Sequence, residues 1–178
     1  MSKNEFEQLI EKHGTDIYRF CYHLTGCRDD ADDLYQDTMC KAYEIRIRIK
    51  TPDDDLKLEK ERNYCLGIAV RLYKNSYRKK VNRKEESLDN GQEEYDERFA
   101  SGVVTGEALE AEERQARVRK SIRELPLKQR TVIYLFYFSE LSIKDIGALL
   151  RIPTGTVKSR LNKAKSALKN ELEDVWYE

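Results

Sequence analysis

The chain has 178 residues, of which 37% are charged and 39% are hydrophobic, and its 33 lysines and arginines balance its 33 aspartates and glutamates. This length suits one or two small domains, and the apolar share is too large for a wholly disordered chain. With only 8 glycines and 3 prolines, long helices meet few breakers. Strand patterns are nearly absent, so the sequence predicts an all-α protein.

Apolar side chains in residues 6–24 recur at spacings of three and four, which indicates a helix. Residues 13–14, His-Gly, are a candidate break in it. Gly26 is a suitable stop residue, and Asp29 or Asp30 can cap the next helix.

The cysteines are Cys21, Cys27, Cys40 and Cys65, and none forms a CxxC pair. Cys21 and Cys27 with His23 resemble a metal site, but they lie on an apolar helical pattern, which favours buried or half-buried free thiols. We therefore expect no metal and no cofactor. The lack of a signal peptide and of a long apolar run predicts a cytoplasmic protein that does not insert into the membrane.

The second predicted helix carries a ridge of acidic and polar side chains. Asp33, Gln36 and Asp37 fall on adjacent faces beside Met39 and Tyr43, because helical positions three and four apart are neighbours. Such a ridge can dock a basic helical partner. Taken alone, however, the acids are better explained by their place near the positive N-terminal end of the helix.

Residues 44–55 fit no single pattern. Isoleucines alternate with basic residues over 45–50, as in a strand, but the segment reads equally well as the frayed end of a helix before Thr51-Pro52. We expect an irregular connection here, followed by a long helix over about residues 56–80.

The long helix combines tyrosines with cations, and residues 68–84 contain seven lysines and arginines but no acid. Aromatic faces can stack on unpaired bases while cations hold a nucleic-acid backbone. The alternative is a set of core tyrosines beside a solvated face. The residues concerned are Tyr64, Tyr73 and Tyr77 with Arg71, Lys74, Arg78, Lys79 and Lys80.

The middle of the chain predicts a flexible acidic linker over residues 83–108 between domains at 1–82 and 109–178. Residues 85–113 hold eleven acids against one arginine, whereas residues 151–170 hold six cations and no acid. Two basic surfaces separated by an acidic tether suit a polyanion that is contacted at two places. Two solvated helix faces would give the same pattern.

Residues 142–161 have helix-turn-helix character. Ser142 and Asp145 make an S-x-x-D start signal, and Pro153 or Thr154 opens a second helix after a short turn. Gly155 keeps the start of that helix slim, and the free N–H groups there can bind phosphate. Outward side chains of the helix can reach base edges in a major groove. The alternative is an ordinary helical hairpin with a basic outer face. The outward residues are Thr154, Thr156, Lys158, Ser159, Arg160 and Lys163.

Three passages make the chain similar to the sigma-70 family, specifically its short extracytoplasmic-function (ECF) group. They are residues 18–43 with Asp-Ala-Asp-Asp-Leu-Tyr-Gln-Asp-Thr, residues 68–80, and residues 125–168 with Ile-Pro-Thr-Gly-Thr-Val-Lys-Ser-Arg-Leu, the most specific string. The resemblance covers most of the chain apart from its middle. It implies an RNA polymerase sigma factor, which joins core RNA polymerase and directs it to a promoter without catalysing a reaction itself.

The resemblance also implies roles for particular residues. The domain at 1–82 would bind the β′ clamp of the polymerase through Asp33, Gln36, Asp37, Met39 and Tyr43. The same domain would recognise and open the −10 promoter element through Tyr64, Arg71, Lys74, Tyr77, Arg78 and Lys79. The domain at 109–178 would contact the β flap and read the −35 element with the six outward residues of its last helix.

Further expectations follow from the same resemblance. The partners are core RNA polymerase, double-stranded and single-stranded promoter DNA and, as a further candidate, an anti-sigma factor. The acidic linker would pass the active-centre channel of the polymerase. We expect a monomer when the protein is free.

Several positions depart from the family pattern and leave the exact −10 contacts open. The departures are Tyr64-Cys65 for Trp-Leu, Val70-Arg71 for Arg-Asn, and Asn75 for Asp. Gly147 replaces the usual Ala, which costs about 1 kcal/mol of helix propensity and little else.

Three other classes of protein fit the sequence less well. A self-standing helix-turn-helix regulator would need a dimerisation element, and none is evident. A sigma-like decoy that titrates an inhibitor without touching DNA would not need the basic recognition helix. An enzyme lacks support, because no glycine-rich phosphate loop, metal cluster or nucleophile-base pair is present, and His13 and His23 are the only imidazoles.

Overall fold

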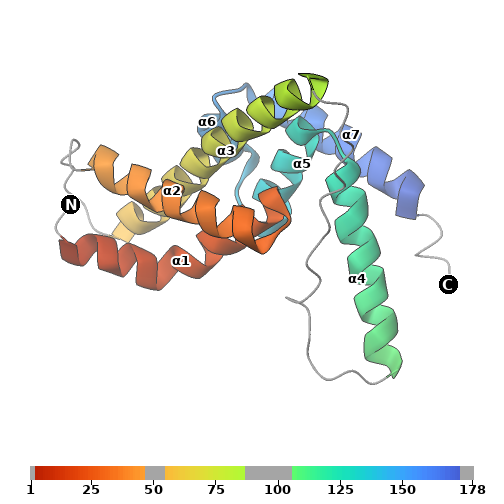
Figure 1. Ribbon diagram of the computed structural model, residues 1–178, viewed down its shortest axis with the longest axis horizontal. Coiled ribbons are helices and arrows are strands. Elements are labelled where there is room, and N and C mark those ends of the chain that lie inside the picture. The colour runs from red at the N-terminus through yellow and green to blue at the C-terminus, as the bar shows by residue number, and fades with distance from the viewer. Residues whose placement is uncertain (1–2, 47–54, 87–105, 173–178) are drawn as a thin grey trace. The chain divides into compact units, whose positions relative to one another are not determined.

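The computed structural model describes residues 3–46, 55–86 and 106–172, and every element within these ranges is helical (Figure 1). The chain divides into two compact units between Asp96 and Glu97. The prediction of an all-α chain with two helical domains is confirmed. Among the described residues, no helix has the length and apolar character that a membrane span requires.

The first unit is built from three helices, α1 (Lys3–Thr25), α2 (Arg28–Arg46) and α3 (Asp55–Glu86). Each of them packs against the other two. Thr38 is buried in their core, where its hydroxyl donates a 2.6 Å hydrogen bond to the carbonyl oxygen of Leu34. Fully buried apolar side chains come from all three helices and include Ile17, Phe20, Leu24, Ala31, Leu66 and Ala69.

Helix α1 runs without interruption through His13 and Gly14, so the candidate break predicted there is absent. A Cβ atom added to Gly14 would lie 3.0 Å from the phenolic oxygen of Tyr35 and 3.4 Å from Cγ2 of Ile10. Gly14 therefore permits a close approach of α1 to Tyr35 on α2, a packing reason for a glycine inside a helix.

The turn between α1 and α2 follows the predicted stop signal. Gly26 adopts a φ of 85°, which favours glycine, and its N–H donates to the carbonyl of Tyr22 at 2.8 Å. The cap prediction differs from the structure, because α2 begins at Arg28 and Asp29 and Asp30 lie inside its first turn. There the two carboxylates interact favourably with the positive N-terminal end of the helix dipole, but they do not cap the helix.

The helices extend further than the sequence indicated. α2 reaches Arg46 and α3 begins at Asp55, so the rest of the segment 44–55 lies outside the described residues. α3 continues to Glu86, because the sequence after residue 80 contains strong helix formers and no breaker. With α4 beginning at Gly106, both ends of the predicted linker 83–108 are helical, and residues 87–105 lie outside the described residues.

The second unit contains α4 (Gly106–Glu124), α5 (Leu127–Ile133), a π-helical turn η2 (Tyr134–Phe138), α6 (Ile143–Leu150) and α7 (Thr154–Leu172). α7 is the central element, and α4, α5 and α6 all pack against it. The core of the second unit is formed by apolar side chains that include Val132, Leu135, Ile146, Val157, Leu161 and Ala164. The elements that position the helix-turn-helix are thus held by one shared core.

A buried thiol makes the stability of the first unit depend on pH. Burial raises the pKa of Cys21 from 9.0 to about 12, while a hydrogen bond with Thr38 acts in the lowering direction. The thiol therefore stays protonated in the folded chain when the unfolded chain has begun to ionise it. The stability that the protonated thiol confers is complete below the unfolded pKa and is lost as pH rises towards the folded pKa.

We expect this loss to be measurable between about pH 8 and about pH 10. Over that interval the free energy of unfolding should fall by roughly 1 kcal/mol more in the natural protein than in Cys21→Ala, which lacks the thiol. Urea unfolding of both proteins at both pH values gives the comparison. An equal fall in the two proteins would contradict the burial of Cys21.

Candidate nucleic-acid and partner interfaces

The predicted start of the helix-turn-helix is confirmed. Ser142 precedes α6, its Oγ accepts the N–H of Asp145 at 3.1 Å, and the same hydroxyl lies 2.5 Å from Oδ2 of that carboxylate. This reciprocal arrangement satisfies an N–H group that the first turn of a helix leaves unpaired.

The turn between α6 and α7 is short and tightly bonded. Arg151 takes a left-handed conformation with a φ of 54°, and the N–H of Ile152 donates to the carbonyl of Gly147 at 2.9 Å. The carbonyl of Pro153 then accepts the N–H of Thr156 at 2.9 Å, and α7 begins at Thr154 as predicted. Only three residues thus separate the end of α6 from the start of α7.

The outer face of α7 carries most of the predicted DNA-contacting side chains. Thr154, Lys158, Ser159 and Lys163 are exposed. The inner face is closed by the buried side chains Val157, Leu161 and Ala164. Thr156 and Arg160 are half-buried, so they lie at the flank of the outward face rather than at its centre.

The basic-aromatic surface of α3 is also exposed. Arg71, Lys74 and Arg78 share one face at spacings of three and four, and Tyr64 lies seven residues before Arg71. The side chain of Tyr64 is 45% exposed and that of Tyr77 is 40% exposed. Lys79 is exposed, whereas Tyr73 is half-buried with its ring centroid 6.1 Å from that of Tyr77. All six predicted −10 residues are exposed on α3. Tyr77 and Lys79 lie on nearly opposite sides of the helix, because they are two positions apart.

The predicted ridge on α2 divides into an exposed part and a buried part. Asp33, Gln36, Asp37 and Tyr43 are exposed. Met39 is only 7% exposed, so it does not lie on the open ridge. We call the four exposed side chains, together with the exposed Cys40 between them, the acidic ridge.

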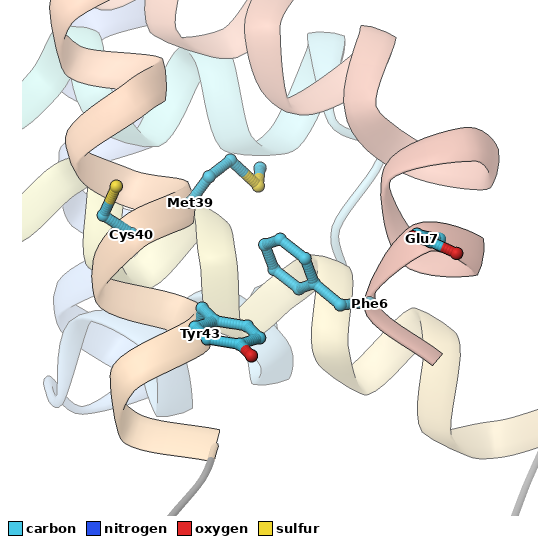
Figure 2. A pocket seen from close by; sticks show the side chains of 5 residues that line it. All are labelled: Phe6, Glu7, Met39, Cys40 and Tyr43. Atoms are coloured by element: carbon cyan, nitrogen blue, oxygen red, sulfur yellow. The ribbon is translucent and has the colours of Figure 1, made fainter. Parts of the chain in front are cut away.

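Met39 instead forms part of a groove between α1 and α2. Figure 2 shows Met39 and Tyr43 of α2 reaching towards Phe6 of α1. The groove has a volume of about 370 Å³ and is lined by Phe6, Glu7, Met39, Cys40 and Tyr43. The aromatic rings of Phe6 and Tyr43 meet edge to face, with their centroids 5.2 Å apart. The sequence pattern did not indicate that Phe6 belongs to this site, because only the packing of α1 on α2 places Phe6 beside the ridge.

Comparison with known proteins identifies the chain. Residues 9–83 match the family described as Sigma-70 region 2, and residues 115–168 match Sigma-70, region 4. The chain is 31% identical over 179 residues to the ECF RNA polymerase sigma factor SigW of Bacillus subtilis, an alignment that covers 97% of this chain and 91% of the relative. The chain belongs to the ECF group of the sigma-70 family. The resemblance read from the sequence is confirmed.

Two solved structures share the fold. The sigma factor RpoE of Bartonella quintana, solved in complex with the anti-sigma factor NepR, superimposes with a TM-score of 0.73 at 22% identity and covers 95% of this chain and 97% of that chain. CnrH, solved in complex with the cytosolic domain of CnrY, gives a TM-score of 0.65 at 20% identity and covers 97% of this chain and 90% of that chain.

The departures of this sigma factor from the family pattern fall on different surfaces. Cys65 is 1% exposed, so its replacement of the usual leucine affects the core rather than a DNA contact. Arg71 and Asn75 are exposed and can change what α3 contacts. Gly147 does more than lower helix propensity, because an added Cβ would lie 3.0 Å from the backbone oxygen of Ile152.

Two further features of this sigma factor were not singled out from the sequence. Asn162 is exposed on α7, three residues after Ser159, and an amide can pair with two edge atoms of adenine. Helical spacing from Ser159 could have found it. The first helix of the second unit, α4, exposes Arg114, Arg117 and Lys120 at spacings of three, and counting charges over residues 114–130 would have revealed them.

An exposed aromatic pair lies at η2, where Tyr137 is 50% exposed and Phe138 is 46% exposed. The ammonium of Lys165 on α7 lies 5.6 Å from the ring centroid of Tyr137, within the range of a cation–π contact. Helical periodicity does not predict this exposure, because a π-helical turn shifts the side chains that follow it out of the regular register.

Gly155 allows a test of how closely α7 approaches its target. An added Cβ at this position meets nothing within 4 Å, so Gly155→Ala should stabilise the second unit by up to about 1 kcal/mol through helix propensity. We expect the same change to weaken promoter binding by the holoenzyme, since it thickens the first turn of α7, the part that is predicted to approach DNA. Thermal unfolding and DNA binding, measured on the same preparation, should move in opposite directions; unchanged DNA binding would contradict a close approach at Gly155.

Proposed function

We propose that this sigma factor binds core RNA polymerase and directs it to specific promoters through contacts with the −35 and −10 elements, without a catalytic step of its own. The observation that carries the proposal is the helix-turn-helix of α6 and α7, which projects Lys158, Ser159 and Lys163 from a helix held in place by buried Val157 and Leu161. This geometry fits a recognition helix in a major groove.

The second unit is proposed to read the −35 element. Cations and hydroxyls along α7 can contact phosphates and base edges, and the start of α7 offers free N–H groups to a phosphate. Arg114, Arg117 and Lys120 on α4 supply further exposed cations for a polyanion. The exposed Tyr137 and Phe138 are a suitable apolar contact for the β flap of the polymerase.

The first unit is proposed to bind the β′ clamp through the acidic ridge and to recognise the −10 element through α3. Tyr64 and Tyr77 can stack on unpaired bases while Arg71, Lys74 and Arg78 hold the backbone. Capture of unpaired bases would trap the opened strand, so the energy for opening comes from binding and needs no ATP.

The remaining features of the proposal concern the cellular setting. The protein acts as a monomer until it joins the polymerase, in the cytoplasm where that enzyme works. An anti-sigma factor is a suitable further partner, because one structural relative, the sigma factor RpoE, was solved with the anti-sigma factor NepR. Among the described side chains, no group of three or more His, Cys, Asp or Glu could hold a metal ion.

In vitro transcription tests the proposed function. Core RNA polymerase is supplied with a library of genomic promoters, with and without the purified chain, and the transcripts are sequenced. The expected result is a set of start sites that appears only when the chain is present and that shares two sequence elements upstream. A transcript pattern identical with and without the chain would refute the proposal.

A further inference from the structure

The groove between α1 and α2 is an apolar cleft with an acidic rim. Phe6, Met39 and Tyr43 supply its apolar surface, and Glu7 is the charged residue among those that line it. Phe6 is half-buried and Tyr43 is 41% exposed, so part of both aromatic rings remains in contact with water. Covering such surface with another apolar group is favourable.

The groove opens at the end of the acidic ridge. Cys40 and Tyr43 belong to both, and they follow Gln36 on the same face of α2 at spacings of four and seven. Asp33 and Asp37 lie exposed one or two turns before the groove. The charges of nearby Lys41 and Glu44, which are 2.8 Å apart, cancel each other, so Asp33, Asp37 and Glu7 give the rim its negative charge. A fitting partner therefore presents basic side chains along the ridge and one large apolar side chain at its end.

We infer that the groove receives an apolar anchor side chain from the same basic helical surface of core RNA polymerase that binds the acidic ridge. This inference rests on the proposed function and adds Phe6 of α1 to the interface. Phe6 and Glu7 lie before residues 9–83, the part matched by the region 2 family.

The two parts of the interface act in different ways. Charges on the ridge guide and orient the partner, and their effect weakens as ionic strength rises. An anchor in an apolar cleft with a polar rim slows dissociation, and it depends little on salt. The contributions of the groove and the ridge can therefore be separated by measuring association and dissociation rates at two salt concentrations.

The test compares three variants for binding to purified core enzyme: Phe6→Ala, which removes one wall of the groove, Asp37→Lys on the ridge, and Ile10→Ala as a control. Ile10 is a 38% exposed apolar residue on the same helix, one turn after Phe6, that does not line the groove. We expect Phe6→Ala to weaken binding about tenfold, mainly through faster dissociation at both salt concentrations. Ile10→Ala should bind as the natural protein does.

The outcomes distinguish the groove from the ridge. If Asp37→Lys abolishes binding while Phe6→Ala behaves like Ile10→Ala, the anchor is refuted and the proposed function stands. If Asp37→Lys also binds normally, the proposed polymerase site itself is wrong. Sedimentation of the free chain tests whether a second copy of the chain occupies the groove. Dimers that form in the natural protein and disappear in Phe6→Ala would assign the groove to a second copy and overturn the inference.

A chemical probe tests the groove from α2 without changing α1. Cys40 is exposed and lines the groove, Cys21 and Cys65 are buried, and Cys27→Ser removes the half-buried thiol. In that background we expect an aromatic thiol adduct at Cys40 to weaken core binding about tenfold, whereas a methylthio adduct, too small to fill the groove, has little effect. Equal affinity with both adducts would contradict an anchor in the groove.

Discussion

Asp37→Lys should reduce binding of this sigma factor to core RNA polymerase by at least about a hundredfold, since like charges that face each other across an interface cost several kcal/mol. Asp37 is exposed in the middle of α2, and lysine is a good helix former. The change should therefore leave thermal unfolding nearly unaltered. Co-purification with core enzyme at low and moderate salt, beside a thermal scan, measures both quantities.

A matched control separates the position of the charge from the change in net charge. Glu171→Lys introduces the same change of charge at an exposed position of α7 in the second unit, which does not belong to the acidic ridge. It should co-purify with core enzyme as the natural protein does. If Asp37→Lys co-purifies normally at low ionic strength, the acidic ridge is not part of the polymerase interface.

The features that sequence reading located are those whose signals lie close together in the chain. The cap at the start of α6 joins Ser142 to Asp145, three residues later. On α7, the buried positions Val157 and Leu161 follow the turn before Thr154 within about two helical turns. Each of these signals is local, because caps, prolines and helical spacing act over three or four residues. The helix-turn-helix was therefore predictable without knowledge of the rest of the fold.

The features that it missed depend on contacts between distant segments. Gly14 suggested a break in α1, but its contact with Tyr35 explains a glycine inside a continuous helix. Met39 has the spacing of a ridge residue, yet it is buried where α2 faces Phe6, more than thirty residues earlier in the chain. Helical spacing gives the face on which a residue lies, whereas its burial is decided by what packs on that face.

The two ends of α7 should respond differently to removal of a cation, because a recognition helix contacts DNA mainly through its N-terminal residues. Lys158→Ala should weaken promoter binding by the holoenzyme and lower the slope of log affinity against log salt by about 0.9 for each phosphate that the lysine neutralises. Lys169→Ala, in the last turn of the same helix, removes an equal charge and should leave that slope nearly unchanged.

Arg160→Ala should combine two effects, because Arg160 is half-buried while Lys158 is exposed. Its stem packs beside the core of the second unit, so the substitution should lower the free energy of unfolding as well as DNA affinity. Lys158→Ala should affect DNA affinity alone. Salt titrations of holoenzyme on a promoter identified by transcription, together with urea unfolding of each variant, separate these outcomes. Parallel salt dependences for Lys158→Ala, Lys169→Ala and the natural protein would mean that the start of α7 does not lie against DNA phosphates.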